Sequence, residues 1–305
     1  MFCVYSFSRN FALKIYSKQQ VRMEIARTAR ELRQALDKRG KEIGFVPTMG
    51  ALHQGHISLV RRAREENGTV AVSIFVNPTQ FNDPRDLAKY PRTEEADLRM
   101  LEAAGTDIVF VPSVAEVYPD PDDRQFDLGE IGKVMEGAHR PGHFNGVAQV
   151  VSRLFDIVEP HRAYFGDKDF QQVAVIEALV RQLGNDVEIV RCPIVRDGDG
   201  LALSSRNALL TPAQRQEAPR IYRTLARAAE KIAAGGGTEE TAEWARQEID
   251  ASPELETEYI EVADEQTLQS VAGESGDKVK KIKKRIFAAV KCGEVRLIDN
   301  VAVNQ

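Results

Sequence analysis

Runs of apolar residues alternate along this chain with segments in which apolar residues recur every three or four positions. Short continuous apolar runs are typical of buried parallel strands, whereas the longer spacing is typical of helices with one buried face. We expect five strands, at residues 43–47, 70–76, 107–111, 162–166 and 187–191. Their alternation with helices predicts an α/β fold with a Rossmann-like, doubly wound parallel sheet.

The pattern changes after the turn Asp197-Gly-Asp-Gly200. Helical patterns follow from Thr211, with Pro212 at the first helical position, and again at residues 238–250. Residues 257–262 then alternate as a half-buried strand. We therefore predict a first domain at residues 23–196, which binds the nucleotide, and a smaller α/β domain at 197–305.

Composition limits the functional class only broadly. The chain has 305 residues and a net charge of −5, which implies no general attraction to nucleic acid. Its three cysteines, Cys3, Cys192 and Cys292, are too far apart for a metal motif and suit a reducing cytoplasm. No apolar run approaches the length that a membrane span requires. The acidic net charge is compatible with a protein that binds a small anion at a local positive site.

Two histidines stand where the first apolar run gives way to a helical pattern. His53 and His56 are three residues apart, so they can share one side of the first helical turn. Free backbone N–H groups and the helix dipole favour an anion there, and Gly50 and Gly55 let the backbone approach a ligand. The segment contains neither the Walker loop nor Gly-x-Gly-x-x-Gly, so it predicts a phosphate site of another kind.

Polar residues follow three more of the predicted elements. Asn77 and Gln80 come after the second strand, at the edge where open α/β sheets bind ligands. Lys168 lies between the fourth strand and a helix, where a point charge can reach a phosphate. Arg140 lies in a glycine-rich loop that is able to close over an anion; a solvated turn is the plainer interpretation. Ser204 would by itself be a helix cap.

The histidine segment resembles a known family. PTMGALHQGH, at residues 47–56, is similar to the His-x-Gly-His signature of nucleotidyl-transferring α/β proteins, in the form found in pantothenate synthetases (pantoate–β-alanine ligases). Further similar strings follow in the family's order: FVNPTQF (75–81), EGAHRPGHFNGV (136–147), GDKDFQQ (166–172), LALSSRN (201–207) and RLIDN (296–300). LALSSRN is a counterpart of the KMSKS loop of class I aminoacyl-tRNA synthetases, with Leu203 where the family usually has Met.

The resemblance implies an activity and a set of site residues. ATP, (R)-pantoate and β-alanine would give pantothenate, AMP and pyrophosphate through pantoyl adenylate, with Mg²⁺ accompanying ATP. The implied catalytic residues are His53, His56, Lys168 and Arg206. The implied ATP-binding residues are Met49, Gly50, His53, His56, Gly166, Lys168, Asp169, Val195, Leu203, Ser204, Ser205 and Arg206. The implied pantoate-binding residues are Asn77, Gln80, Arg140 and Gln172. No acidic cluster identifies a protein ligand for the metal, and the family suggests a cytoplasmic homodimer.

Other functions remain open from the residues. A different adenylyl- or cytidylyltransferase would not need β-alanine, and the pair Gln80 and Gln172 counts against it. A nucleotide-binding regulatory module without turnover is disfavoured by the intact His53, Lys168 and Arg206. A tRNA-binding role lacks an anticodon-binding domain. Six basic residues between 278 and 285 suggest a nucleic-acid patch, but we favour a solvated strand face with Val279 and Ile282 inward.

The first 22 residues differ from the rest in composition. Four basic residues precede the first acid, Glu24, and aromatic side chains are dense. This composition suggests either an organelle-type presequence or an upstream extension of a protein that begins at Met23. We favour the extension, because a helical pattern and the family resemblance both start at Met23. In either case, we expect this segment to be disordered.

Overall fold

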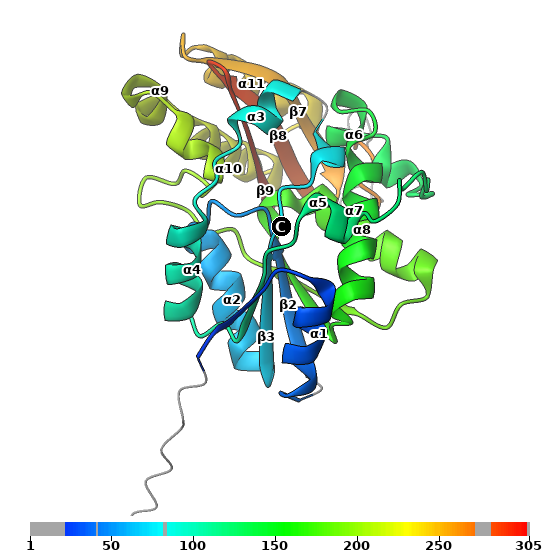
Figure 1. The fold of residues 1–305 in the computed structure, drawn as a ribbon. Helices are drawn as coiled ribbons and strands as arrows, with labels where there is room; N and C mark the ends of the chain where they lie inside the picture. The colour runs from blue at the N-terminus through cyan, green and yellow to red at the C-terminus, as the bar shows by residue number, and fades with distance from the viewer. Residues whose placement is uncertain (1–21, 41, 82–83, 272–281, 304–305) are drawn as a thin grey trace, which may run out of the picture.

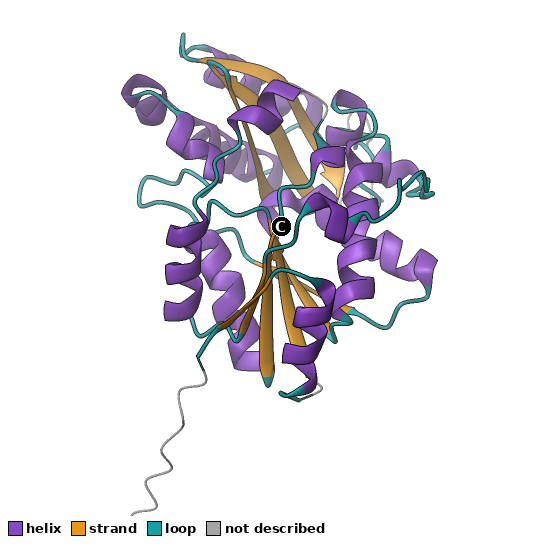
Figure 2. Ribbon diagram, viewed as in Figure 1, coloured by secondary structure: helices purple, strands orange, loops and turns teal. Residues whose placement is uncertain are grey.

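The computed structural model describes residues 22–40, 42–81, 84–271 and 282–303. Within these ranges the chain forms two sheets with helices packed around them (Figures 1 and 2). The predicted N-terminal extension therefore lies outside the described residues, except for Arg22. The larger sheet has six strands and the smaller one has three.

The larger sheet is parallel and has the strand order β1-β4-β3-β2-β5-β6. Its strands are β1 (Glu24–Ala26), β2 (Ile43–Thr48), β3 (Thr69–Ile74), β4 (Ile108–Phe110), β5 (Arg162–Gly166) and β6 (Glu188–Cys192). The chain runs outward from β2 through β3 to β4 and then returns to β5 on the other side of β2. The order therefore reverses between β2 and β5, where open α/β sheets bind their ligands.

Helices cover both faces of this sheet, as Figure 1 shows. On one face lie α2 (Gln54–Glu66) and α4 (Glu94–Ala103), whose apolar residues pack on β2 and β3. On the other lie α1 (Ala29–Asp37), α7 (His143–Val158) and α8 (Phe170–Leu183). Burial on both faces explains why β2, β3 and β4 are continuous apolar runs in the sequence.

Short helices connect these elements. The 3₁₀ turns are η1 (Pro78–Gln80), η2 (Glu130–Gly132), η3 (Asp167–Asp169) and η4 (Ser205–Leu209). The short α-helices are α3 (Pro84–Lys89), α5 (Val114–Val117), α6 (Glu136–His139) and α9 (Pro212–Glu217). Thr211 caps α9 with a capping box and Pro212 at the first helical position, which confirms the predicted helix start.

The smaller sheet is antiparallel, in the order β7-β8-β9. Its strands are β7 (Leu255–Asp264), β8 (Lys284–Cys292) and β9 (Val295–Val303), and α10 (Arg220–Ala233) and α11 (Thr238–Asp250) pack against it. The prediction of a doubly wound parallel sheet with a second, smaller α/β domain is therefore confirmed. The predicted boundary at 196–197 falls at the segment that joins the two sheets.

Two details of the sequence-based prediction were wrong at the start of the chain. The pattern from Met23 suggested a helix, but residues 24–26 form β1, a sixth strand beside β4. Helix α1 begins at Ala29, because Thr28 forms a capping box with Glu31. A strand of three residues is too short to show an alternating pattern.

The basic segment near residue 280 also differs from the expectation. Residues 278–281 lie outside the described ranges, and Ile282 packs against the core of the second domain as predicted. Lys284 is buried, however, and Arg285 forms an ion pair with Glu265 at 2.8 Å, so these two residues are not part of a solvated face.

Candidate active site

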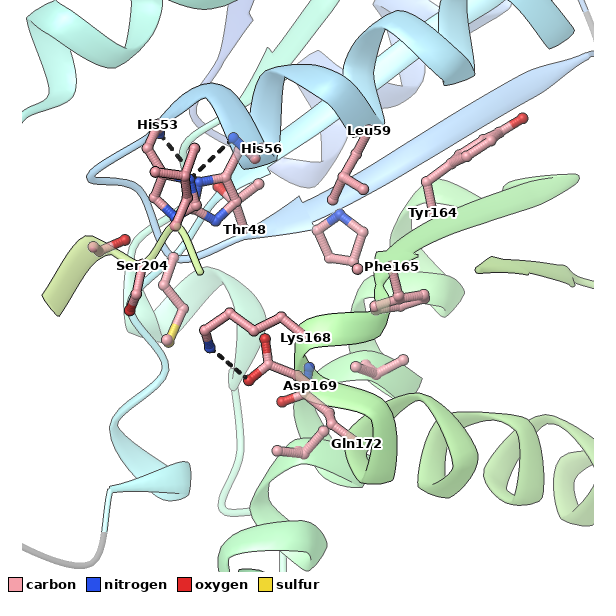
Figure 3. Close-up of a pocket in the computed structure, with 18 of the residues that line it drawn as sticks. Thr48, His53, His56, Leu59, Tyr164, Phe165, Lys168, Asp169, Gln172 and Ser204 are labelled. Atoms are coloured by element: carbon pink, nitrogen blue, oxygen red, sulfur yellow. Dashed lines mark hydrogen bonds and ion pairs between the residues drawn. The ribbon is translucent and has the colours of Figure 1, made fainter. Parts of the chain in front are cut away.

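A cavity of about 220 Å³ opens at the carboxyl ends of β2 and β5. Of the predicted site residues, all except Gly50 and Arg140 line it. Figure 3 shows His53 and His56 at the start of α2, with Lys168 and Asp169 in the turn η3 and Gln172 in the first turn of α8. The reversal in strand order thus brings together segments more than a hundred residues apart.

His53 and His56 form a closely packed pair that is fixed by the backbone. His53 Nδ1 accepts a hydrogen bond from the Gly55 N–H at 3.1 Å, and His56 Nδ1 accepts one from the His53 N–H at 3.3 Å. The ring centroids are 4.1 Å apart. Because both Nδ1 atoms act as acceptors, each neutral ring carries its proton on Nε2. Each histidine thereby keeps one N–H donor that the loop does not use.

Both rings are held neutral. Burial, together with the charge of Lys168, lowers the pKa of His53 to about 4. Burial also lowers the pKa of His56 to about 3, with additional contributions from His53 and Lys168. At neutral pH the pair therefore offers hydrogen-bond donors without a positive charge of its own, and the charge at the site comes from lysine and arginine.

The loop before the histidines is held by a residue that the sequence did not reveal. Asp97 of α4 is buried, and its carboxylate accepts hydrogen bonds from the N–H groups of Ala51 and Leu52 at 2.9 and 2.8 Å. Gly50 and Ala51 both have positive φ, 76° and 50°. Gly50 therefore shapes the loop behind the cavity. Thr93, the N-cap residue of α4, makes no side-chain cap hydrogen bond and donates its hydroxyl to Asp97 at 3.1 Å.

Lys168 lies in the 3₁₀ turn η3, between β5 and α8. Its ammonium is 3.4 Å from the carboxylate of Asp169, and both side chains line the cavity. On the far side of the turn, Asp167 forms an ion pair with Arg191 at 3.2 Å. The turn after β5 therefore presents the Lys168 ammonium to the cavity. The ion pair between Asp167 and Arg191 supports the same turn.

The segment after the domain boundary closes one wall of the cavity. The Leu203 N–H donates a hydrogen bond to the carbonyl of Val195 at 3.0 Å. Ser205 Oγ then donates to the carbonyl of Ala51 at 2.9 Å, so this segment contacts the histidine loop directly. Ser204 caps η4, and Arg206 pairs with Asp86 of α3 at 3.0 Å.

Gln80 and Gln172 line the same cavity from opposite sides of the sheet's reversal point. The Gln80 amide nitrogen lies 3.0 Å from the sulfur of Met49, and its oxygen accepts from Asn77 at 3.2 Å. Asn77 is buried, and its amide also contacts Gly146 and the hydroxyl of Tyr118. Asn77 therefore lines the cavity but is engaged by the protein, and it orients Gln80.

The two neighbouring glutamines of the GDKDFQQ segment have different surroundings. Gln171 is buried and donates to the carbonyls of Ile131 and Val134, both at 2.8 Å. Its oxygen accepts from the N–H of Glu136 at 3.0 Å. Gln172 faces the cavity instead (Figure 3). The sequence analysis selected Gln172 as a site residue. Gln171 instead binds the backbone of residues 131–136 and has a structural role.

Arg140 lies outside the cavity that holds both glutamines. It lines an adjoining cavity of about 640 Å³ between the domains, which shares Lys168, Asp169, Ser204 and Arg206 with the first. Its guanidinium donates to His143 Nε2 at 3.1 Å, and His143 Nδ1 lies 2.9 Å from the carbonyl of Gln80. Arg140 therefore reaches Gln80 only through His143.

No group of three or more His, Cys, Asp or Glu side chains that would suit a metal ion occurs in the part of the chain that the structure describes. Asp169 is the carboxylate of this cavity nearest to Lys168. Mg²⁺ keeps several waters and is commonly held by one or two carboxylates together with substrate phosphates. The donors present fit a metal that arrives with a nucleotide better than a resident protein-bound ion.

Three comparisons with known proteins show what the whole chain is similar to. The sequence model of the family described as Pantoate-beta-alanine ligase matches residues 23–302. The pantothenate synthetase of Bacteroides fragilis (strain YCH46) is 52% identical over 282 residues, covering 92% of this chain and 98% of that protein. The crystal structure of the Thermus thermophilus pantothenate synthetase is 44% identical, with a TM-score of 0.85, and the match covers 93% and 100% of the two chains.

A third relative was solved with ligands. The pantoate-beta-alanine ligase of Francisella tularensis, described as complexed with beta-gamma ATP and beta-alanine, is 36% identical with a TM-score of 0.75. The match covers 93% of this chain and 98% of that one. Family model, sequence relatives and structural neighbours agree over nearly the whole described chain. The chain therefore belongs to the pantoate–β-alanine ligase family.

Proposed function

We infer that this protein ligates (R)-pantoate and β-alanine to pantothenate, using ATP and releasing AMP and pyrophosphate. Family membership over residues 23–302 supports the activity, as do the names of the relatives. The observation that carries the assignment to this cavity is the meeting of two sets of side chains. Phosphate-directed donors from α2, η3 and η4 converge with two glutamine amides in one cavity.

The proposed reaction has two steps, formation of pantoyl adenylate and transfer of the pantoyl group to β-alanine. A pantoate carboxylate oxygen attacks the α-phosphorus of ATP, and the bond to pyrophosphate breaks. The amine of β-alanine then attacks the acyl carbon of pantoyl adenylate, AMP leaves with the bonding electrons of the acyl–oxygen bond, and the nitrogen loses a proton. Because two anions must meet in the first step, positioning and charge neutralisation are the main tasks of the protein.

We assign the histidines and Lys168 to the phosphate that reacts. The Nε2–H groups of His53 and His56 donate to its oxygens as negative charge develops, since their Nδ1 atoms are held by the backbone. Lys168 supplies the positive charge from the opposite side of the cavity. Neutral imidazoles suit this task, because they can donate without having to lose or gain a proton first.

The remaining ATP contacts follow from the walls of the cavity. Ser204, Ser205 and Arg206 hold the β- and γ-phosphates and the leaving pyrophosphate. The further ATP-binding residues proposed in these walls are Met49, Gly166, Asp169, Val195 and Leu203. Gly50 lies behind the cavity and contributes through the shape of the histidine loop. Arg206 must exchange its ion pair with Asp86 for the phosphates, which places α3 beside the entering nucleotide.

Pantoate is assigned to the end of the cavity that contains Gln80 and Gln172. Their amides suit both the hydroxyl groups and the carboxylate of pantoate, because an amide donates and accepts. Asn77 contributes by orienting Gln80. Arg140 contributes through His143, which contacts the Gln80 carbonyl, rather than as a direct ligand of pantoate.

Several properties of the family extend the proposal. Mg²⁺ would accompany ATP and would neutralise part of the charge of its phosphates, and the enzyme would work in the cytoplasm as a homodimer formed through the first domain. Among the described residues, no helix has the length and apolar character needed to cross a bilayer. Strand β1, at the edge of the parallel sheet, exposes Ile25 to the extent of 46%. Sedimentation of the purified protein would measure the subunit number.

The function is tested first by ATP–pyrophosphate exchange with Mg²⁺ and pantoate, without β-alanine. We expect exchange that depends on pantoate, because pantoyl adenylate forms reversibly. Pantothenate production that requires β-alanine, without any exchange, would retain the ligase but reject the two-step route. No turnover in either assay would contradict the assignment.

A further inference from the structure

Strand β9 contacts the first domain through three polar side chains of the segment RLIDN. Arg296 forms a bidentate ion pair with Glu136, at 2.7 and 2.8 Å. Asp299 forms another with Arg196, at 2.6 and 2.8 Å, in the segment that joins the domains. Asn300 reaches the turn that carries Lys168. The reaction assigned above gives this segment no direct role, although it approaches the cavity from the second domain.

The Asn300 side chain forms hydrogen bonds with the main chain on both sides of the Lys168 α-carbon. Its amide nitrogen donates to the carbonyl of Asp167 at 2.9 Å and to the carbonyl of Lys168 at 3.1 Å. Each carbonyl belongs to a peptide plane that adjoins the residue. Fixing both planes therefore fixes the direction in which the lysine side chain leaves the backbone.

The Asn300 amide is itself locked. Its oxygen accepts from Arg285 Nη1 at 2.6 Å, and Arg285 is in turn paired with Glu265. The side chain is only 2% exposed, so water cannot readily replace these contacts. A guanidinium can only donate and the two carbonyls can only accept, so the partners themselves determine which end of the amide carries nitrogen.

The first domain supports the same turn through an ion pair. Asp167 pairs with Arg191, whereas the N-cap position, Gly166, provides no side-chain cap. One residue later, the Phe170 ring contacts both Arg191 and Arg285, whose guanidinium carbons lie 4.4 and 4.3 Å from the ring centroid. The second domain thus completes the support of this turn through Asn300 and Arg285.

We propose that Asn300 is a positioning residue for Lys168, and that it makes the placement of this lysine depend on docking of the second domain. The inference rests on the proposed contact between Lys168 and the reacting phosphate. Asn300 does not touch substrate; it acts by holding two peptide planes. A displacement of the ammonium by about 1 Å is enough to reduce a rate by about 100-fold.

The test is a double-mutant cycle between Asn300 and Lys168. Asn300→Asp keeps the shape of the side chain but places an oxygen against two carbonyl oxygens. Single-turnover formation of pantoyl adenylate should then slow by about 10- to 100-fold, with little change in the KM for β-alanine. In the Lys168→Ala background the same substitution should change the rate by less than about threefold, because the group it positions is gone.

Two results would overturn the proposal. One is an adenylation rate for Asn300→Asp equal to that of the unmodified enzyme. The other is a loss of equal size with and without Lys168, since a general structural defect would be additive. A Lys168→Ala enzyme of full activity would instead refute the proposed role of Lys168, so the two failures are distinguishable.

Asn300→Ala is measured in the same double-mutant cycle and removes the amide without adding charge. The test therefore still works if Asn300→Asp does not fold. Gln149→Glu is the matched control. Gln149 of α7 is also buried, its amide nitrogen donates to two main-chain carbonyls, those of Asp122 at 2.8 Å and Arg124 at 3.0 Å, and it is not among the residues that line the cavity. This control should lower the unfolding temperature while leaving the adenylation rate of the folded enzyme unchanged.

Discussion

The chemistry of single residues in this site depends on which hydrogen bonds the backbone has already taken. His53 and His56 use Nδ1 as an acceptor for main-chain N–H groups, which leaves Nε2–H for a ligand. His143 shows a different arrangement, with Nδ1 beside the Gln80 carbonyl and Nε2 beside Arg140. His143 therefore uses its ring nitrogens differently from His53 and His56, although the sequence shows the same residue type.

Replacing His56 by alanine should reduce the rate of pantoyl-adenylate formation by about 10²–10³-fold, because one fixed donor to the transition state is lost. Rapid-quench measurement of the first turnover would show this. Gln54→Ala is the control, because Gln54 is exposed on the same helical turn. A His56→Ala enzyme with an unaltered first turnover would remove the histidine pair from the mechanism.

The buried histidines should remain neutral well below pH 6.5. Burial lowers the pKa of His143 to about 4, as it lowers that of His53. Nitrogen chemical shifts of the imidazoles, assigned with single His→Gln variants, would follow each titration. Protonation of His53 or His56 near pH 6.5 in the free enzyme would contradict the geometry described here.

The same depressed pKa values contribute to the pH dependence of stability. Between about pH 4 and 6.5 the unfolded chain binds protons at these histidines that the folded protein does not bind. Stability must therefore fall as the pH is lowered through this window, by up to about 1.4 kcal/mol per pH unit for each group. Urea unfolding at a series of pH values would show a shallower slope for His143→Gln.

At the scale of elements, the histidine loop is held by a helix that is remote in sequence. Asp97 on α4 supplies both acceptors for the N–H groups of Ala51 and Leu52. Gly50 has little room for a side chain, since a Cβ there would lie 3.0 Å from Ile74 Cγ2 and 3.1 Å from Asp97 Oδ2. The helix start that presents the two histidines therefore depends on packing between α4 and the loop.

Asp97→Asn should destabilise the protein by about 1–3 kcal/mol, because one of the two N–H groups loses its acceptor in a buried site. The adenylation rate should fall as well, since the loop leads directly into His53. Urea unfolding and first-turnover kinetics measure the two effects. Glu95→Gln, on the exposed side of α4, is the control and should stay within about 0.5 kcal/mol. Equal stability of the two variants would show that Asp97 does not hold the loop.

At the scale of the whole molecule, the two domains meet around a buried carboxylate. Glu136 lies at the start of α6 and receives Arg296 of β9 and the hydroxyl of Tyr259, the latter at 2.9 Å. Burial by itself would raise the pKa of Glu136, but the hydrogen bonds and charge of Arg296 outweigh it, so the pKa is lowered. Arg296 of the second domain therefore keeps the carboxylate charged although docking buries it.

Removing the partner of this carboxylate should be costly. Arg296→Met leaves Glu136 buried with Tyr259 and a more distant Arg140, so we expect a loss of about 3–5 kcal/mol. The double variant Arg296→Met/Glu136→Gln should recover part of that loss. Calorimetric unfolding measures the stability of the single and the double variant. Arg33→Met, which breaks an exposed ion pair with Glu159, should cost less than about 1 kcal/mol. An Arg296→Met protein as stable as this control would mean that the bridge does not join the domains.

The sequence by itself determined the parallel sheet and most of the cavity. Buried parallel strands require continuous apolar runs, and phosphate binding requires particular residue types at helix starts, so both leave a local pattern. Asp97, Asn300 and the link from Arg140 to Gln80 through His143 leave no such pattern. Their roles arise from contacts between segments far apart in the chain, such as Asp97 with Leu52 and Asn300 with Lys168. Only the tertiary structure decides those contacts, because they depend on how α4 and β9 pack against the ends of the parallel strands.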